Sequence, residues 1–215
     1  MSSELKKRSD IHWARKSWHV IGVGLLTLIY AYFPKSTALG IFVMIWLCFV
    51  PGDLIRRKFP ALNDLVLHVF KSILRESEVK GPSGTTYLLS GVFLVALIFP
   101  RDVVLLTLLF LGFADPAASL IGIKYGKDKI FGHKSLQGSV AAFVVCFILM
   151  VIYLFIQGFP VGRLIIMSLI GGLVGALAEL IPIGKLDDNL SLPILSAVSI
   201  WILFMVFGEL PLIAS

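Results

Sequence analysis

Long apolar stretches separated by short polar segments make up most of the 215-residue chain. Crossing the hydrocarbon core of a bilayer takes about 20 residues of helix, within a range of about 17–25. Seven stretches are candidates for membrane spans: residues 18–33, 38–50, 85–99, 103–123, 140–156, 164–183 and 190–207. The second and third are short for a full crossing. The alternatives for these two segments are a span through a locally thinned bilayer and a partly re-entrant segment. The pattern therefore predicts about seven transmembrane helices.

A different pattern occupies residues 61–77, between the second and third candidate spans. Leu62, Leu65, Val66 and Val69 recur at helical spacing, and polar residues lie between them. This alternation is typical of an amphipathic helix that lies in the membrane interface. We expect this segment to be an interfacial helix, with a substrate-binding surface as the alternative.

The composition also indicates a membrane protein. Hydrophobic residues make up 58% of the chain and charged residues 15%, whereas soluble domains average about 45–50% apolar and about 25% charged residues. No polar stretch is long enough for a separate soluble domain, so the sequence predicts one all-α, polytopic membrane domain over residues 1–215. Cys48 and Cys146 both lie inside apolar stretches, which favours packing roles over a disulfide framework.

The basic residues are distributed very unevenly between the two ends of the predicted spans. Four alternate segments, residues 1–17, 51–84, 124–139 and 184–189, hold 16 of the 19 Lys and Arg residues. By the positive-inside rule these segments are cytoplasmic, which places the N-terminus inside and the C-terminus outside. The net charge of +6 comes from short clusters between apolar stretches. It therefore favours membrane lipid headgroups and nucleotide phosphates as partners, and not nucleic acid.

Asp115 is the leading candidate for chemistry. An ionisable residue at the bilayer centre raises the free energy of membrane insertion by on the order of 2.5–3.5 kcal/mol. Because such residues are rare for this reason, an ionisable residue within a span is a functional candidate. Pro116 follows it, and proline removes a helix hydrogen bond and tends to kink the chain. Ser119, Gly122 and Gly126 share a helical face with Asp115. We expect this small, polar face to bind a phosphate; the alternative is a buried aspartate satisfied by a neighbouring helix.

A segment rich in glycine and lysine follows, from residue 126 to residue 139. Glycine lets the backbone approach a ligand closely, and lysine supplies a point charge for phosphate oxygens. The candidate phosphate-binding residues here are Lys127, Lys134, Ser135 and Gly138. A P-loop is excluded, because the Walker A spacing is missing and no Ser or Thr follows Lys127. The alternative is that this basic loop only fixes the orientation of the neighbouring spans in the membrane.

Acidic and amide side chains gather at the inner end of the last two spans, where Glu179 is followed by Asp187, Asp188 and Asn189. Mg²⁺ prefers such oxygen ligands and usually takes one or two carboxylates together with substrate phosphates. We expect these four residues and Asp115 to be the metal ligands. The alternative for residues 187–189 is a cap for the last helix.

Two further groups are candidates for anion binding. Arg15, Lys16 and His19 fall on one side of the first helix, although anchoring at the inner membrane surface explains the first two equally well. Lys80 and Gly84 precede the third span, where free N–H groups at a helix N-terminus favour an anion. A plain capping loop explains that segment equally well.

Taken together, these motifs resemble the CTP-dependent lipid kinase family, which includes dolichol kinase, phytol kinase and the yeast-type diacylglycerol kinase and is related to the phosphatidate cytidylyltransferases. The matching stretches are residues 14–19, 114–127, 134–139 and 179–193, in family order and over most of the chain. The resemblance implies that Arg15, Lys16, Asp115 and Gly122 are needed for activity. Ala114 and Gln137 stand where the family often has Gly and Glu, and the change at Gln137 removes a possible metal ligand or charge from the loop at residues 134–139.

The resulting hypothesis is an Mg²⁺-dependent kinase on the cytoplasmic side that transfers the γ-phosphoryl group of CTP, or of another nucleoside triphosphate, to a membrane-dissolved lipid alcohol. The alcohol is a prenol, such as phytol, a polyprenol or a dolichol, or diacylglycerol. Asp115, Asp188, Arg15 and Lys16 are the expected catalytic residues. Two alternatives remain: a cytidylyltransferase that makes a CDP-lipid, and a non-enzymatic transporter or scaffold. A transporter needs a polar path to the outer leaflet, and the outer halves of the spans have few ionisable residues.

Overall fold

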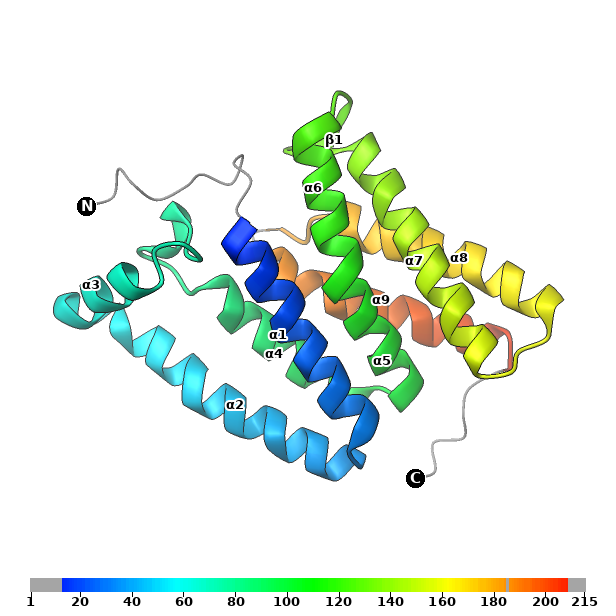
Figure 1. The fold of residues 1–215 in the computed structure, drawn as a ribbon, viewed down its shortest axis with the longest axis horizontal. Coiled ribbons are helices and arrows are strands. Elements are labelled where there is room, and N and C mark those ends of the chain that lie inside the picture. Colours follow the sequence, from blue (N-terminus) through cyan, green and yellow to red (C-terminus); the bar gives the residue numbers. More distant parts are fainter. Residues whose placement is uncertain (1–12, 185, 209–215) are drawn as a thin grey trace.

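The computed structural model describes residues 13–184 and 186–208, and nearly all of its regular structure is α-helical (Figure 1). The elements are α1 (Trp13–Tyr32), α2 (Lys35–Arg56), α3 (Pro60–Val69), the 3₁₀ turn η2 (Glu76–Glu78), α4 (Gly84–Ile98), α5 (Arg101–Leu109), the π-helical turn η3 (Phe110–Ala114), α6 (Asp115–Tyr125), β1 (Lys129–Phe131), β2 (Lys134–Ser135), α7 (Leu136–Ile156), α8 (Val161–Leu180) and α9 (Asp188–Val206). The all-α prediction is confirmed. The small antiparallel hairpin of β1 and β2 was not predicted.

All seven apolar stretches lie largely within helices. In the described part of the chain, five helices are long and apolar enough to cross a membrane: α2, the continuous rod Arg101–Tyr125 formed by α5, η3 and α6, and α7, α8 and α9. Helix α4 is apolar but has only 15 residues. The chain is thus a helical protein with several candidate spans, and a total of seven crossings stays a prediction.

The helix expected over residues 61–77 is shorter than predicted. Helix α3 begins at Pro60, where the fixed φ of proline suits a first turn, and ends at Val69, and none of its residues is buried. Beyond it, the carbonyl of Ile73 accepts a hydrogen bond from Arg15 Nη1 at 3.1 Å, so this carbonyl is drawn toward α1. The placement of α3 in a membrane interface stays a prediction.

Helix packing depends on small residues where α8 meets α7. A Cβ added at Gly171 lies 2.7 Å from Met150 Cε, and one added at Gly175 lies 2.7 Å from Cys146 Sγ. Glycine at these two positions, four residues apart in the sequence, therefore lets the two helices approach closely. Cys146 is fully buried in this contact, whereas Cys48 is exposed on α2; both are free thiols. The packing role expected for both cysteines is thus found for Cys146 but not for Cys48.

One end of the helix bundle gathers many chain segments. The N-terminal ends of α1, α7 and α9 meet the C-terminal ends of α6 and α8 there, and the hairpin projects from the same end (Figure 1). Helix α9 packs against α4, α5 and α8, and α1 packs against α5. Polar residues that are far apart in the sequence are thereby brought to one end of the structure.

Candidate active site

A cavity of about 370 Å³ opens at this end, between α1, α6, the hairpin, α7, α8 and α9. Its polar and glycine lining residues are Arg15, Lys16, His19, Arg75, Asp115, Ser119, Gly122, Lys129, His133, Lys134, Ser135, Gly138, Glu179, Asp187, Asp188 and Asn189. All but four of the residues predicted for the site are in this set. Basic, acidic and amide groups from distant parts of the chain therefore share one cavity.

A π-helical turn presents Asp115 to the cavity. The Asp115 N–H donates to the Phe110 carbonyl, and Pro116 has no N–H to donate, so the Leu111 carbonyl is left for another donor. His19 Nε2 lies 2.8 Å from this oxygen, and because a carbonyl only accepts, we infer that Nε2 carries the proton. The same nitrogen is 3.8 Å from Asp115 Oδ2. Instead of the predicted kink, the proline is accommodated by a π turn, a feature frequent at functional sites.

Lys16 joins α1 to the polar face of α6. Its Nζ donates to Ser119 Oγ at 2.8 Å and to the Pro116 carbonyl at 3.4 Å. Lys16 precedes the apolar stretch that begins at residue 18, and burial lowers the pKa of its ammonium below the usual value, while the nearby Asp115 carboxylate opposes this shift. A partly buried ammonium beside a hydroxyl and a carboxylate is a suitable contact for phosphate oxygens.

Lys134 also lines the cavity, beside α8 and α9. Its Nζ lies 3.4 Å from Glu179 Oε1 and 3.6 Å from Asp188 Oδ1, and it also donates to the Glu179 main-chain carbonyl. Strand β2 places Lys134 there, because Ser135, the next residue, caps α7 by accepting a hydrogen bond from the Gly138 N–H at 3.2 Å. One cation thus bridges two acidic side chains from α8 and α9.

Two of the predicted glycines have a packing reason to be glycine. A Cβ added at Gly138 lies 2.8 Å from the Ala118 carbonyl oxygen, and one added at Gly122 lies 3.2 Å from Ser135 Oγ. Both residues line the cavity, so the close approach of α6 and α7 also forms one of its walls.

The N-terminus of α9 combines a cap with cavity-lining groups. Asp187 Oδ1 accepts from the Asn189 N–H at 3.0 Å and from Asn189 Nδ2 at 2.9 Å. Asp187 is therefore the helix cap, which agrees with the capping alternative considered for residues 187–189. Asp188, in the first turn of α9, remains as the carboxylate opposite Lys134.

The chemistry of the lining residues fits a nucleotide-bound magnesium ion. In residues 13–184 and 186–208, no group of three or more His, Cys, Asp or Glu side chains lies close enough to hold a metal by itself. Mg²⁺ needs no such group when one or two carboxylates are completed by substrate phosphates and water. Asp115 and Asp188 line the same cavity as the cations of Lys16 and Lys134, which suits a metal delivered with phosphates.

Four predicted phosphate ligands do not line the cavity. Lys80 and Lys127 are exposed, and the Gly84 N–H already donates to Glu78 Oε1 at 3.0 Å. Gly126 packs against Ser135, whose Oγ lies 2.5 Å from an added Cβ. These four residues therefore lie outside the cavity lining.

The loop that departs from the family pattern has a structural role. Gln137 Oε1 accepts from the backbone N–H groups of Lys127 and Asp128 at 3.2 and 3.4 Å, and Gln137 Nε2 donates to Asp128 Oδ2 at 2.6 Å. An amide serves here as both acceptor and donor, which a glutamate does not.

Sequence reasoning missed three basic lining residues, Arg75, Lys129 and His133. Arg75 and Lys129 lie in segments whose positive charge was explained by membrane topology, and no spacing singled them out. Only the folding of the hairpin and of the loop after α3 over the bundle end brings them to the cavity. Lys185 and the basic residues of the first 12 positions, which supported the predicted orientation, lie outside the described residues.

Curated proteins that are similar to this chain include three of the same name. The CTP-dependent diacylglycerol kinase 1 of Schizosaccharomyces pombe is 35% identical over 173 residues, which cover 72% of this chain and 77% of that protein. The proteins of the same name from Eremothecium gossypii and Saccharomyces cerevisiae are each 34% identical, over 68% and 67% of this chain. The matched regions cover 52% and 57% of those two proteins, or about half of their length. No family model and no solved structure matches the chain.

Proposed function

This chain belongs to the CTP-dependent lipid kinase family, and from this premise we propose that it transfers the γ-phosphoryl group of CTP to the hydroxyl group of diacylglycerol. The three relatives carry diacylglycerol in their names, which favours an acylglycerol over a prenol as the acceptor. Five helices long and apolar enough to span a membrane suit an enzyme whose acceptor is dissolved in the bilayer.

One observation supports the proposed reaction most strongly: Lys16, Lys134, Asp115 and Asp188, from separate elements, line a single cavity. Phosphoryl transfer requires mainly that the donor and acceptor be positioned and that the spreading negative charge be neutralised. Two ammonium groups from separate elements, each beside a carboxylate, meet both requirements. We assign the triphosphate to the space between them.

Each lining residue then has a defined task. Lys16, Lys134 and Arg15 bind phosphate oxygens, and Ser119 keeps Lys16 in place through the 2.8 Å hydrogen bond. Asp115 and Asp188 would hold Mg²⁺, which would neutralise phosphate charge when bound. Asp115 also follows the apolar turn η3, so it is the carboxylate better placed to orient a hydroxyl group that arrives from the bilayer.

His19 positions the π turn and does not act as a base in this proposal. Its Nε2–H is engaged by the Leu111 carbonyl at 2.8 Å, so that nitrogen has no lone pair for a proton of the acceptor. The proton of the lipid hydroxyl therefore goes to Asp115 or to solvent as the new phosphate ester forms.

The proposal is tested with purified protein in mixed micelles that contain diacylglycerol, phytol or a polyprenol, together with Mg²⁺ and CTP radiolabelled at either the γ- or the α-phosphorus. We expect label in phosphatidate from γ-labelled CTP only, with CDP as the second product. In parallel micelles that contain phosphatidate as the acceptor, incorporation of α-label with release of pyrophosphate would identify a cytidylyltransferase instead. Transfer to the prenols but not to diacylglycerol would overturn the proposed acceptor, and no transfer at all would reject the enzyme.

A further inference from the structure

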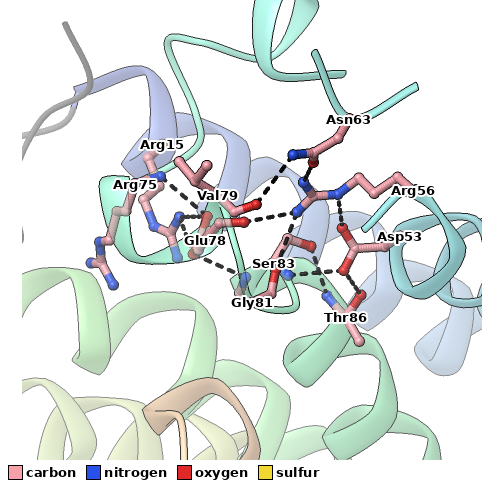
Figure 2. Close-up of polar contacts among 11 residues, drawn as sticks. Arg15, Asp53, Arg56, Asn63, Arg75, Glu78, Val79, Gly81, Ser83 and Thr86 are labelled. Carbon is pink, nitrogen blue, oxygen red and sulfur yellow. Dashed lines mark hydrogen bonds and ion pairs between the residues drawn. The ribbon is translucent and has the colours of Figure 1, made fainter. Parts of the chain in front are cut away.

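Arg15 is held at the edge of the cavity by an acidic residue that does not line it. Arg15 Nη1 lies 2.8 Å from Glu78 Oε1 and 3.1 Å from Glu78 Oε2 (Figure 2). It also donates to the Ile73 carbonyl at 3.1 Å. The two side chains are 14% and 6% exposed. Among the described residues Arg15 makes these polar contacts with Nη1 only, and a guanidinium has five N–H donors, so others remain for a phosphate.

Glu78 is itself fixed by main-chain groups. Its Oε1 accepts from the Gly84 N–H at 3.0 Å, at the start of α4, and its Oε2 accepts from the Arg75 N–H at 3.2 Å. A carboxylate is favoured at a helix N-terminus, and both oxygens are engaged before Arg15 is counted. Glu78 thus presents a fixed negative charge to Arg15.

Gly84 provides the space that the Arg15 guanidinium occupies. A Cβ added at Gly84 lies 2.3 Å from Arg15 Nη2, 2.8 Å from Asn189 Nδ2 and 3.2 Å from Glu78 Oε1. Any side chain at this position must displace the Arg15 guanidinium and the Asn189 side-chain amide. This is a second observation, independent of the ion pair, that the position of Arg15 is determined by the loop before α4.

A buried network anchors that loop to α2. Arg56, 1% exposed, donates through Nη2 to the Glu78 carbonyl at 3.0 Å and through Nε to Asp53 Oδ1 at 2.8 Å. Asp53 Oδ2 in turn accepts from the Ser83 N–H at 2.8 Å and from the Thr86 hydroxyl at 2.6 Å. Figure 2 shows this chain of contacts running from Asp53 to Arg15.

We propose that Glu78 is a positioning residue that holds the Arg15 guanidinium against the triphosphate of CTP, within a rigid loop anchored by the Asp53–Arg56 pair. This inference rests on the proposed function, because Arg15 must bind phosphate for its position to matter. Glu78 acts through Arg15 and does not touch the substrate.

The test compares Glu78→Gln and Gly84→Ala with wild-type protein in mixed micelles, and measures KM for CTP, KM for diacylglycerol, kcat and the unfolding temperature. Glu78→Asp is the conservative variant. Glu76→Gln is the matched control, because Glu76 is an exposed residue of the same 3₁₀ turn. Equilibrium dialysis with radiolabelled CTP measures nucleotide binding without turnover.

Hydrogen bonds to charged groups are strong enough that we expect KM and Kd for CTP to rise about tenfold or more in Glu78→Gln and Gly84→Ala, with KM for diacylglycerol within about twofold of wild type. Glu78→Asp should recover part of the loss, and Glu76→Gln should match wild type. Unchanged CTP affinity in Glu78→Gln would overturn the proposal. So would equal weakening for both substrates, or a fall in kcat and unfolding temperature with both KM values intact, since each indicates a purely structural role. If the wild-type protein binds CTP but phosphorylates no lipid, the proposed function fails while the dialysis result still decides the role of Glu78.

Discussion

Substitutions at Lys134 can distinguish the contribution of its ammonium group to stability from its contribution to phosphoryl transfer. Its Nζ lies 3.4 Å from Glu179 Oε1 and 3.6 Å from Asp188 Oδ1, and the side chains of Lys134, Glu179 and Asp188 are 9%, 10% and 24% exposed. The change Lys134→Met preserves most of the side-chain volume and removes the ammonium. Two carboxylates then face each other without a cation between them.

The expected loss of stability follows from the burial of the pair. Removing one partner of a buried ion pair costs about 3–5 kcal/mol, because the other charge is left uncompensated. Since water reaches Asp188 more easily than Glu179, we expect the lower end, about 3 kcal/mol. For a chain of this size that corresponds to a fall of about 6–12 °C in Tm, at about 2–4 °C per kcal/mol. The double variant Lys134→Met/Glu179→Gln leaves no uncompensated buried charge at Glu179, so it should recover most of this loss.

The assay pairs thermal unfolding, followed by the fluorescence of the four tryptophans, with γ-phosphoryl transfer from CTP. Both variants should be inactive, because neither has the ammonium that binds phosphate. Lys58→Met, at an exposed position, is the control and should resemble wild type in both measurements. A double variant as unstable as Lys134→Met refutes the charge-burial argument, and kinase activity in either variant refutes the role of Lys134 in phosphate binding.

Three further predictions concern the same cavity. Asp115→Asn should lower kcat by at least about a hundredfold with little change in Tm, since general acid–base groups contribute about 10²–10⁴-fold; activity near wild type would exclude Asp115 from the site. Gly138→Ala should lower the free energy of unfolding by about 1–3 kcal/mol, because its Cβ would lie 2.8 Å from the Ala118 carbonyl oxygen. Gly162→Ala is the control, since its Cβ would meet nothing within 4 Å. Equal Tm values for the two variants would contradict the close packing of α6 on α7. Removing divalent cations with EDTA should abolish transfer, and added Mg²⁺ should restore it; full activity in EDTA would rule out the metal.

Local sequence patterns predicted the helices and one wall of the cavity. The apolar stretches determine helices because a backbone in a bilayer must satisfy its hydrogen bonds internally. Helical spacing placed Asp115 and Ser119 on one face, and Lys16 indeed contacts that face through Ser119. These inferences needed only residues within a few turns of one another.

The remaining features depend on contacts between distant segments. Glu78 contacts Arg15 across 63 residues, and nothing in the spacing of residues 75–84 indicates that pairing. Gly84 appeared to be a possible anion site because its N–H begins a helix, but Glu78 occupies that N–H. The π turn at residues 110–114 was also missed, because a proline after Asp115 predicts a kink equally well. The Glu78–Arg15 pair, the engaged Gly84 N–H and the π turn all depend on tertiary packing, which the periodicity of the sequence does not describe.

The central claim, that this cavity binds the triphosphate of CTP, is tested most directly by photolabelling with a CTP derivative that carries an aryl azide on its γ-phosphate. Proteolysis and mass spectrometry then locate the cross-linked residues. We predict cross-links within residues 115–138 and 179–189, the two segments that supply most of the cavity lining, and their loss when excess CTP is added. Cross-links confined to the opposite end of the bundle, or insensitive to CTP, would contradict the account.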